Sequence, residues 1–573
     1  MGRFFVKNSH QLLRISKKCC TFAAAKVFCI MKKGTKITLW VVGSFVALCV
    51  VAVMCADIIA SCVVRREVRN AFAQMPEVKA EVGGIFLHLL SGSAIVKDIT
   101  FCTNNLSLED TIGRQEPGLA LHIPTIAVWN IKYKELLRHK HLDFQKLSID
   151  DLEVLLYMDE QHPETMLPYI PKDTTLEKAP MWLRQITARR IDIDDLSAQL
   201  ISTTSPLRVH AEDLSVDVRD IVYCFEDSTL HYNDSVYDLR LEALHLATPD
   251  GLMAIEAHEL QTRNAGPLSL GYTRVQNIVD PQKMADKARE PITWIDMELN
   301  GLSTSAINPI RKALQADYTL DSLHADVRRM HVCRDERYAP KRPFETPQEF
   351  MMKIPVEFTV RHADAYVRAI DIYFFSTLVN CGEMHLKKAH GQMSNITNRP
   401  GAVWKNRMSA PFGEQGQMTA QFNMHMNRAS EFEAKMDGKH IETHDINSFI
   451  RPLVGITCEC HIDRLNAEYK GNKTMATGEF CMEYHGLNIQ VHKEDNIPYK
   501  IVTKNADTFT TLANSLIPKS NPTAVDINPR RYQVEWKRDE WKPYPLYVFG
   551  PCIDGVKKTM LPGLYVHKQA KYK

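Results

Sequence analysis

The chain has 573 residues, of which 45% are hydrophobic and 24% are charged, a composition typical of a folded protein. The formal net charge of +2 is unevenly distributed, because residues 1–36 carry nine basic residues and no acidic one. Asp57 is the sole charge in 37–64, so residues 65–573 hold 61 basic and 67 acidic residues. A mildly acidic body argues against nucleic acid as the partner.

An apolar run follows the basic segment. Residues 37–60 contain no charge before Asp57, and a helix of about 20 such residues spans a bilayer. Trp40 lies near the start of the run, where an interfacial aromatic residue is expected. Because basic residues mark the cytoplasmic side, we expect residues 1–36 to be cytoplasmic. The chain from residue 65 onward is then expected on the opposite side of the membrane.

Other interpretations of the N-terminus stay open. A basic segment before an apolar run also begins a cleaved signal peptide. The tetrapeptide "IASC" at 59–62 resembles a lipoprotein cleavage box that ends in Cys62, and Met31 is an alternative translation start. The length of the run and the position of Asp57 favour the uncleaved anchor.

The cysteines do not form a recognisable metal or disulfide framework. Six of the 14 lie at or before Cys62, and the other eight are scattered without a CxxC pair or zinc-ribbon spacing. Cys458 and Cys460 would be about 6–7 Å apart on one face of a strand, too far for an easy disulfide. Long-range disulfides remain open in an exported chain.

Most of the chain beyond the anchor is predicted to form strands. Residues 83–101 favour two strands joined by a Ser-Gly-Ser turn, and turn residues recur every ten to fifteen residues thereafter. Short helices are predicted at 65–75, 132–139, 305–315, 444–452, 505–517 and 545–560, and irregular loops at 160–180, 278–291 and 334–349.

The strands alternate apolar and polar residues, which is typical of a sheet with one apolar face. In 417–427 every even position is apolar, and 354–361 alternates in the same way. Elsewhere the phase changes partway, as between Ala211 and Leu214 and at Gly486, which predicts bulges.

The number of strands predicts the overall architecture. Roughly twenty strands spaced about 4.8 Å apart would give a sheet about 100 Å long, and the few helices cannot cover its apolar face. Such a face must close on itself or hold something apolar. The fold class predicted is mainly β: one N-terminal transmembrane helix, then an elongated, curled antiparallel sheet that forms a β-groove, with a few short helices.

No residue pattern points to catalysis, a cofactor or a metal. The sequence from residue 65 contains no nucleophile elbow, zinc-protease motif, phosphate-binding loop or dinucleotide fingerprint. "CECHID" at 458–463 and "IDIDD" at 191–195 fit ordinary strands better than sites. In "ATGEFCMEYHGLNIQV" at 476–491, the polar set from Glu479 to His485 would spread over about 20 Å, too far for one metal ion. No enzyme activity is therefore expected.

The chain resembles the AsmA-like family, in particular its Bacteroidetes-type, membrane-anchored members. Residues 444–495 contain a short helix, "PLVGI", "AEYKGN", "ATGEF" and "YHGL" in the family's order. The stretches "FTTLANSLIPKSNP" at 509–522 and "GVKKTM" at 555–560 resemble the family's tail. At the other end, 84–101 resembles its membrane-proximal region. The sequence departs from the family pattern where Gly486 replaces a commoner Asp or Asn.

The resemblance implies an inner-membrane, single-pass protein with a cytoplasmic N-terminus and a periplasmic body. The family is similar to bridge-like lipid transfer proteins, so the implied function is to carry or shield acyl chains, with phospholipid as the expected partner. A non-transporting envelope scaffold that assists outer-membrane protein assembly, with envelope proteins as partners, is the alternative. The predicted regions are a cytoplasmic segment at 1–36, an anchor at 37–60, a membrane-proximal region at 65–160, a sheet body at 161–440 and a C-terminal region at 441–573.

The candidate lipid-facing residues are those on the apolar phase of the clearest strands. They are Ile354, Val356, Phe358, Val360, Met418, Phe422, Met424, Met426, Phe480, Met482, Tyr484, Leu487 and Ile489. Methionine is flexible and adaptable, which would suit contact with a mobile chain.

Overall fold

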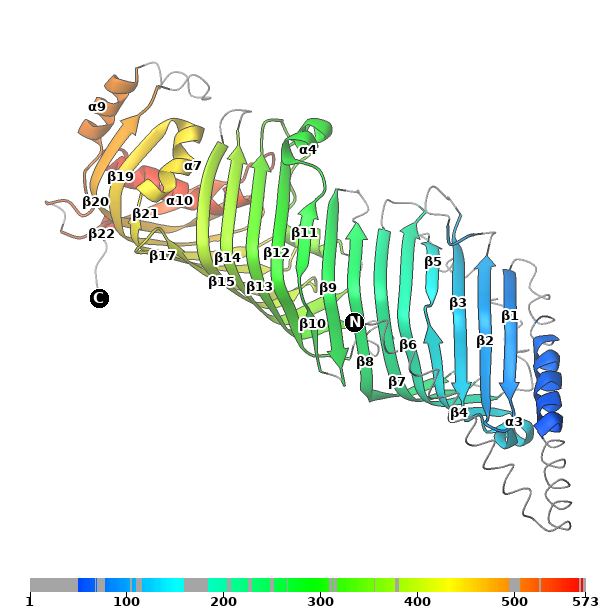
Figure 1. Ribbon diagram of the computed structural model, residues 1–573. Helices are drawn as coiled ribbons and strands as arrows, with labels where there is room; N and C mark the ends of the chain where they lie inside the picture. Colours follow the sequence, from blue (N-terminus) through cyan, green and yellow to red (C-terminus); the bar gives the residue numbers. More distant parts are fainter. Residues whose placement is uncertain are drawn as a thin grey trace, which may run out of the picture.

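One long, curved sheet makes up most of the protein (Figure 1). The computed structural model describes residues 50–66, 69, 78–103, 106–109, 116–158, 184–203, 208–224, 229–247, 252–264, 266–308, 312, 317–354, 356–376, 381–493, 505–524, 527–565 and 568–569. Within them, 22 strands join into a single sheet, which confirms the mainly β, elongated and curled architecture predicted from the alternation.

The strands follow one another along the sheet in chain order, and α10 turns back over the C-terminal strands (Figure 1). The strands are β1 (Val78–His88), β2 (Ser93–Thr103), β3 (Gly118–Trp129), β4 (His141–Asp150), β5 (Glu153–Met158), β6 (Gln185–Ser202), β7 (Arg208–Cys224), β8 (Thr229–Ala247), β9 (Met253–Arg263), β10 (Pro267–Leu270), β11 (Thr273–Asn277), β12 (Ile292–Ala306), β13 (Tyr318–Asp335), β14 (Phe358–Phe375), β15 (Cys381–Thr397), β16 (Val403–Phe412), β17 (Gly416–His425), β18 (Phe432–Glu442), β19 (Ile456–Gly471), β20 (Met475–Val491), β21 (Arg530–Lys537) and β22 (Lys568–Gln569). The helices are α3 (Tyr133–His139), α4 (Pro281–Ala288), α6 (Pro347–Met352), α7 (His444–Val454), α9 (Ala506–Leu516), α10 (Tyr544–Met560) and the short η3 (Pro562–Leu564).

The sheet is mostly antiparallel, with two exceptions. β4 and β5 lie end to end beside β3, and both pair with β6 in parallel. β13 and β14 are also parallel. The prediction of an antiparallel sheet is therefore wrong at these two places. Parallel neighbours require a crossover connection, which brings the chain back to the edge of the sheet at which the preceding strand began.

The first strand is pinned to a helix at residues 50–66. Asp57 Oδ1 accepts a hydrogen bond from Leu89 N at 2.8 Å, and Ser61 Oγ accepts one from Leu87 N at 2.9 Å. These bonds satisfy backbone groups at the free edge of β1. In the described part of the chain, no helix is both long and apolar enough to cross a membrane. Residues 37–49 of the predicted anchor lie outside the described residues.

Four predicted helices are confirmed: α3, α7, α9 and α10. The predicted helices at 65–75 and 305–315 fall largely outside the described residues. The predicted loops 278–291 and 334–349 are wrong in part, since they contain α4 and the first half of α6. Their start signals are in the sequence: Asp280 caps a helix with Pro281 at its first position, and Thr346 makes a capping box with Glu349.

Bulges align across the sheet. Left-handed residues that are not glycine interrupt β2, β6, β7, β9 and β15 at Asp98, Asp195, Asp213, Glu259 and Lys388, with φ between 52° and 56°. Asp195 and Asp213 flank the Leu196–Leu214 pair, so neighbouring strands change phase at the same level. The predicted phase changes after Ala211 and at Gly486 (φ 72°) are confirmed.

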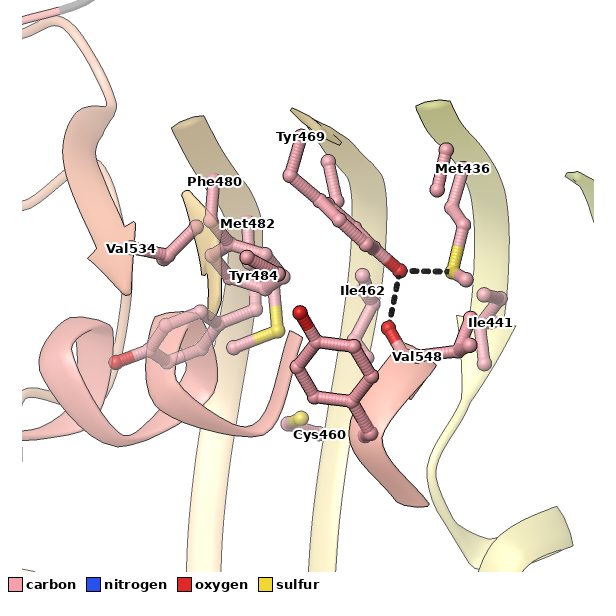
Figure 2. Close-up of a cluster of buried hydrophobic side chains, with 14 of the residues drawn as sticks. Met436, Ile441, Cys460, Ile462, Tyr469, Phe480, Met482, Tyr484, Val534 and Val548 are labelled. Atoms are coloured by element: carbon pink, nitrogen blue, oxygen red, sulfur yellow. Dashed lines mark hydrogen bonds between the residues drawn. The ribbon is translucent and has the colours of Figure 1, made fainter. Parts of the chain in front are cut away.

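The C-terminal strands carry the largest hydrophobic core of the described chain. α10 lies on one face of β18 to β21 and buries Phe480, Met482 and Tyr484 of β20 to within 2% exposure (Figure 2). Tyr469 of β19 donates a hydrogen bond to the carbonyl of Val548 in α10 at 2.7 Å. The end of the sheet is therefore capped by its own helix.

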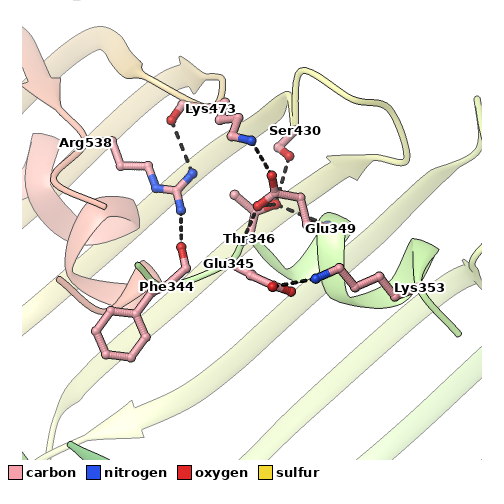
Figure 3. A network of polar contacts seen from close by, with 8 residues as sticks. All are labelled: Phe344, Glu345, Thr346, Glu349, Lys353, Ser430, Lys473 and Arg538. Atoms are coloured by element: carbon pink, nitrogen blue, oxygen red, sulfur yellow. Dashed lines mark hydrogen bonds and ion pairs between the residues drawn. The ribbon is translucent and has the colours of Figure 1, made fainter. Parts of the chain in front are cut away.

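The connection between the parallel strands β13 and β14, residues 336–357, is named the strap. At its start the Tyr338 hydroxyl donates to Asp286 of α4 at 2.7 Å. Further along, Phe344 hydrogen-bonds Glu540 and Arg538, and buried Thr346 hydrogen-bonds Ser430 at 2.8 Å (Figure 3). The strap thus joins α4 to the loops at the C-terminal end of the sheet.

Candidate functional site

The face covered by α10 is named the inner face, and the register extends it across the sheet. Paired residues of neighbouring strands point to one face. Phe480, Leu487 and Ile489 belong to one core cluster although they stand on both sides of the Gly486 bulge. The bulges therefore keep apolar residues on the inner face on both of their sides.

The same continuity holds at β15, where α7 covers the inner face. Gly382 lies against Phe449 and Leu453 of α7. Leu386, four residues further along the strand, shares the face of Gly382 because side chains alternate with period two. Leu386 is the last member of an uninterrupted row of apolar side chains.

This set of residues is named the apolar row. Its members are consecutive register partners on eleven strands, spanning about 50 Å at about 4.8 Å per strand. They are Leu119, Leu156, Leu200, Val209, Leu246, Ile255, Val275, Met297, Met330, Ile370 and Leu386. No polar residue interrupts it.

A second row, two or three residues along each strand from the first, is nearly as apolar. It runs from Leu121 through Leu244 and Leu299 to Ala389, and Thr273 is its one polar member. Thr273 is 6% exposed, so its hydroxyl presents little surface. The two rows make a broad apolar strip along the inner face.

The central part of the strip is open among the described residues. The described helices pack against β4, β12, β13, β15 and β19 to β21, and none packs extensively on β6 to β9. There the inner side chains, such as Leu200, Val209 and Ile255, are half-buried by their neighbours alone. Exposed apolar surfaces of this extent mark sites of interaction.

The opposite, outer face carries charge. Arg190 lies 3.0 Å from both Asp192 and Asp217, and Arg368 lies 2.7 Å from Asp326. The hydrogen bond from Arg368 holds the pKa of Asp326 below its usual value. The sheet therefore has one charged face and one apolar face.

Asp371 is the centre of a polar cluster on this outer face. Its carboxylate lies 2.7 Å from both His331 and His385 and 3.4 Å from Arg329. Burial alone would raise the pKa of Asp371, but the hydrogen bonds from His385, His331 and Arg329 and the charge of His331 outweigh burial and lower it. The cluster fits cross-strand stabilisation, because Asp371 follows Ile370 directly and faces away from the strip.

The candidate residues of the C-terminal strands lie in the capped core. Phe480, Met482, Tyr484, Leu487 and Ile489 are between 0% and 8% exposed, beneath or beside α10. Met418 and Phe422 pack against the same core, while Met424 and Met426 are buried at the end of β17. These residues share the inner face but are covered by the chain itself.

The candidates at 354–360 are divided by the start of a strand. The predicted strand over 354–361 is wrong at its beginning, since β14 starts at Phe358 and Val360 continues it. Asn398 donates hydrogen bonds to the carbonyls of Ile354 and Val356 instead. These carbonyls therefore take a side-chain partner, and Val356 is 41% exposed outside the sheet.

The residue patterns considered for metal binding are spread over two faces. In the residues that the structure describes, no three His, Cys, Asp or Glu side chains could hold a metal ion, and the cysteines are free thiols. Cys460 is buried in the core, whereas His461 lies on the outer face, 2.5 Å from Glu442. Glu479 pairs there with Arg531 at 3.0 Å.

Sequence reasoning missed the central strip, where the open surface lies. The alternation of β7 contained it: Val209 and Ala211 are followed by Leu214 and Val216 after the bulge at Asp213. The bulge itself was predicted from the phase change after Ala211; the pattern did not show that no described helix packs extensively on β6 to β9.

Comparison of the chain with protein-family models, with curated proteins and with solved structures finds no match.

Proposed function

We propose that the protein carries or shields lipid acyl chains along the open apolar strip, with phospholipid as the principal cargo. The observation that carries the proposal is the apolar row, eleven strands without a polar member. Acyl chains would lie on the inner face while head groups stay in water. Transfer of this kind requires no catalytic residue or cofactor.

The energetics favour such an occupant. Each methylene removed from water contributes about 0.8 kcal/mol, so ten methylenes on the strip would contribute several kcal/mol even if half-covered. The binding free energy of an acyl chain would change little from one strand to the next, because the row offers a similar apolar surface throughout. Movement along the sheet would therefore meet low barriers.

The membrane placement is part of the proposal. Residues 50–66 continue the apolar run that begins at residue 37, and their apolar side chains, such as Met54, Ile58 and Ile59, are about 60% exposed. Exposed apolar side chains on a helix fit a lipid environment. Because Asp57 and Ser61 bind β1, the sheet would begin at the membrane surface. The body would then extend into the periplasm, as in AsmA-like proteins, which the sequence resembles.

The alternative, an envelope scaffold that assists outer-membrane protein assembly, predicts a polar barrier across the inner face. The unbroken apolar row favours lipid carriage instead. Edge-strand pairing with a client would not require such a row.

Site-directed photocrosslinking in living cells tests the proposal. A photoreactive amino acid at Leu246 or Val275, both in the apolar row, should yield lipid adducts. The same residue at Gln261 or Gln276, which face outward on β9 and β11, serves as the control and should yield few. Equal labelling of both faces, or none, would contradict lipid carriage.

A further inference from the structure

An apolar pocket of about 390 Å³ lies at the C-terminal end of the inner face. Its floor is the register pair Cys458 and Ile489 on β19 and β20. Its walls are α7, α9 and the end of α10, which contribute Ile450, Ala513 and Met560 among others. The volume falls in the range of small-molecule sites and well above the roughly 150 Å³ of a cavity that holds benzene.

Two asparagines hold the walls to the floor by the same device. Asn514 of α9 accepts a hydrogen bond from Ile489 N at 2.9 Å and donates one to Ile489 O at 2.7 Å. Asn447 of α7 does the same with Cys458 N and O, each at 3.0 Å. Each side-chain amide thus satisfies the backbone groups that a neighbouring strand would otherwise pair. At this level β18 no longer pairs with β19, and β21 no longer pairs with β20.

These bonds leave the pocket without polar groups to offer a ligand. The backbone groups of the floor are satisfied by the asparagines, and Thr510 of α9 accepts from Val491 N at 2.9 Å. The lining side chains are hydrocarbon apart from the sulfur atoms of Cys458 and Met560. A water molecule needs two to four polar partners, so this lining favours hydrocarbon over water.

The pocket adjoins the end of the apolar row. Leu386 ends the row on β15, and Gly382 of the same strand lies against Phe449 and Leu453 of α7. Ile450 of the same helix faces the pocket. α7 thus contacts both β15, where the row ends, and β19, which forms part of the pocket floor.

We propose that this pocket is a binding site for the methyl end of an acyl chain, where a chain carried on the inner face comes to rest. The inference rests on the proposed lipid carriage and adds a terminal site to it. The carboxyl end or head group of the lipid would stay outside the pocket, because the pocket lining has no polar group to hydrogen-bond it.

Labelling with two forms of palmitic acid tests this site in the full-length protein reconstituted in lipid nanodiscs. One form carries a diazirine at its methyl end, the other beside its carboxyl group. The methyl-end probe should label peptides from 505–524 and 450–460, and the carboxyl-end probe should label them at least about tenfold less, as a few methylenes of depth imply. Equal labelling by both probes would overturn the proposal.

A filled variant sharpens the test. Ala513→Trp places an indole in the pocket and should reduce methyl-end labelling there by about tenfold or more, since the occluded methylenes lose their contacts. Leu512→Trp is the matched control, because Leu512 is 48% exposed on the same helix, and its labelling should equal that of the parent protein. Unchanged labelling in Ala513→Trp contradicts the site.

The two proposals fail in different ways. Lipid adducts at Leu246 without pocket labelling would overturn the terminal site and leave lipid carriage standing. Absence of both would overturn both. Because the two palmitic acid probes are compared on the unaltered protein, the result does not depend on whether Ala513→Trp folds.

Discussion

At the residue scale, small residues and left-handed positions decide how closely the inner face can be covered. A Cβ on Gly555 of α10 would lie 2.1 Å from Cγ of Phe480, so glycine is the residue that lets the helix approach β20. Phe480 itself is fully buried beneath it. The packing of α10 over the C-terminal core therefore depends on the absence of a side chain at Gly555.

Substituting this glycine should destabilise the cap. Gly555→Ala forces the helix away from Phe480 and should lower the free energy of unfolding by about 1–3 kcal/mol, the usual cost of overpacking. Gly563→Ala, where a Cβ meets nothing within 4 Å, is the control and should change it by less than about 0.5 kcal/mol. Thermal unfolding of both variants by circular dichroism checks this, and equal midpoints would contradict the packing.

Asp371 predicts a pH dependence. Its pKa is lowered in the folded state, so the stabilisation it gives is present above the unfolded value of about 3.9 and is lost as the pH falls through the lower folded value. The parent protein should therefore melt above Asp371→Asn at pH 7, and the difference should shrink as the pH falls below about 4. A difference that stays constant between pH 7 and pH 3 would show that Asp371 acts through packing.

At the element scale, the strap determines how the two parallel strands are joined. Its buried contact is Thr346, which caps α6 and hydrogen-bonds Ser430. Its exposed contact is the pair between Lys353 and Glu345 at 2.5 Å (Figure 3). Burial makes the first contact structural and solvent screening makes the second weak.

Two strap variants separate these contributions. Thr346→Ala removes a helix cap and leaves Ser430 without its partner, and should cost about 1–2 kcal/mol. Lys353→Ala, in a pair that is 64% and 48% exposed, should cost less than about 0.5 kcal/mol. Hydrogen exchange of α6 should be faster in the first variant alone. Similar exchange in both would show that the strap is held elsewhere.

Alternation of side chains predicted the strands, and α7, α9 and α10 follow from local patterns. The capped core could not be predicted, because the contact of α10 with β20 joins Gly555 and Phe480, which are 75 positions apart in the sequence. The pocket could not be predicted either, because no sequence pattern relates Asn447 of α7 to Asn514 of α9. The parallel pairing of β13 with β14 depends on the course of the strap, which composition does not specify.

At the scale of the whole molecule, the sheet is a surface with one continuous apolar face and a charged reverse. Proposed carriage requires the entire row and not one site on it. A single charge placed in the row would therefore act at a distance, by separating the strip into two parts.

Ile255→Glu tests this continuity. A carboxylate in the row would have to be desolvated by a passing acyl chain, at a cost of several kcal/mol. Photocrosslinked lipid should then persist at Leu156, between the charge and β1, and fall at least about fivefold at Ile370, beyond it. Ala254→Glu, the next residue and on the outer face, is the control and should leave both signals unchanged. Unchanged labelling at Ile370 in Ile255→Glu would contradict passage along the row.

The aligned bulges have a consequence for how such a chain can vary. Five strands carry a left-handed residue on the same line across the sheet, at Asp98, Asp195, Asp213, Glu259 and Lys388, where the alternation of faces changes phase. Deleting one residue within a single strand would turn half of that strand over and place polar side chains among its neighbours' apolar ones. Strand length is thus coupled from one neighbour to the next. Insertions and deletions should be tolerated in the turns, while the strands can lengthen only by pairs of residues or by adding a whole hairpin.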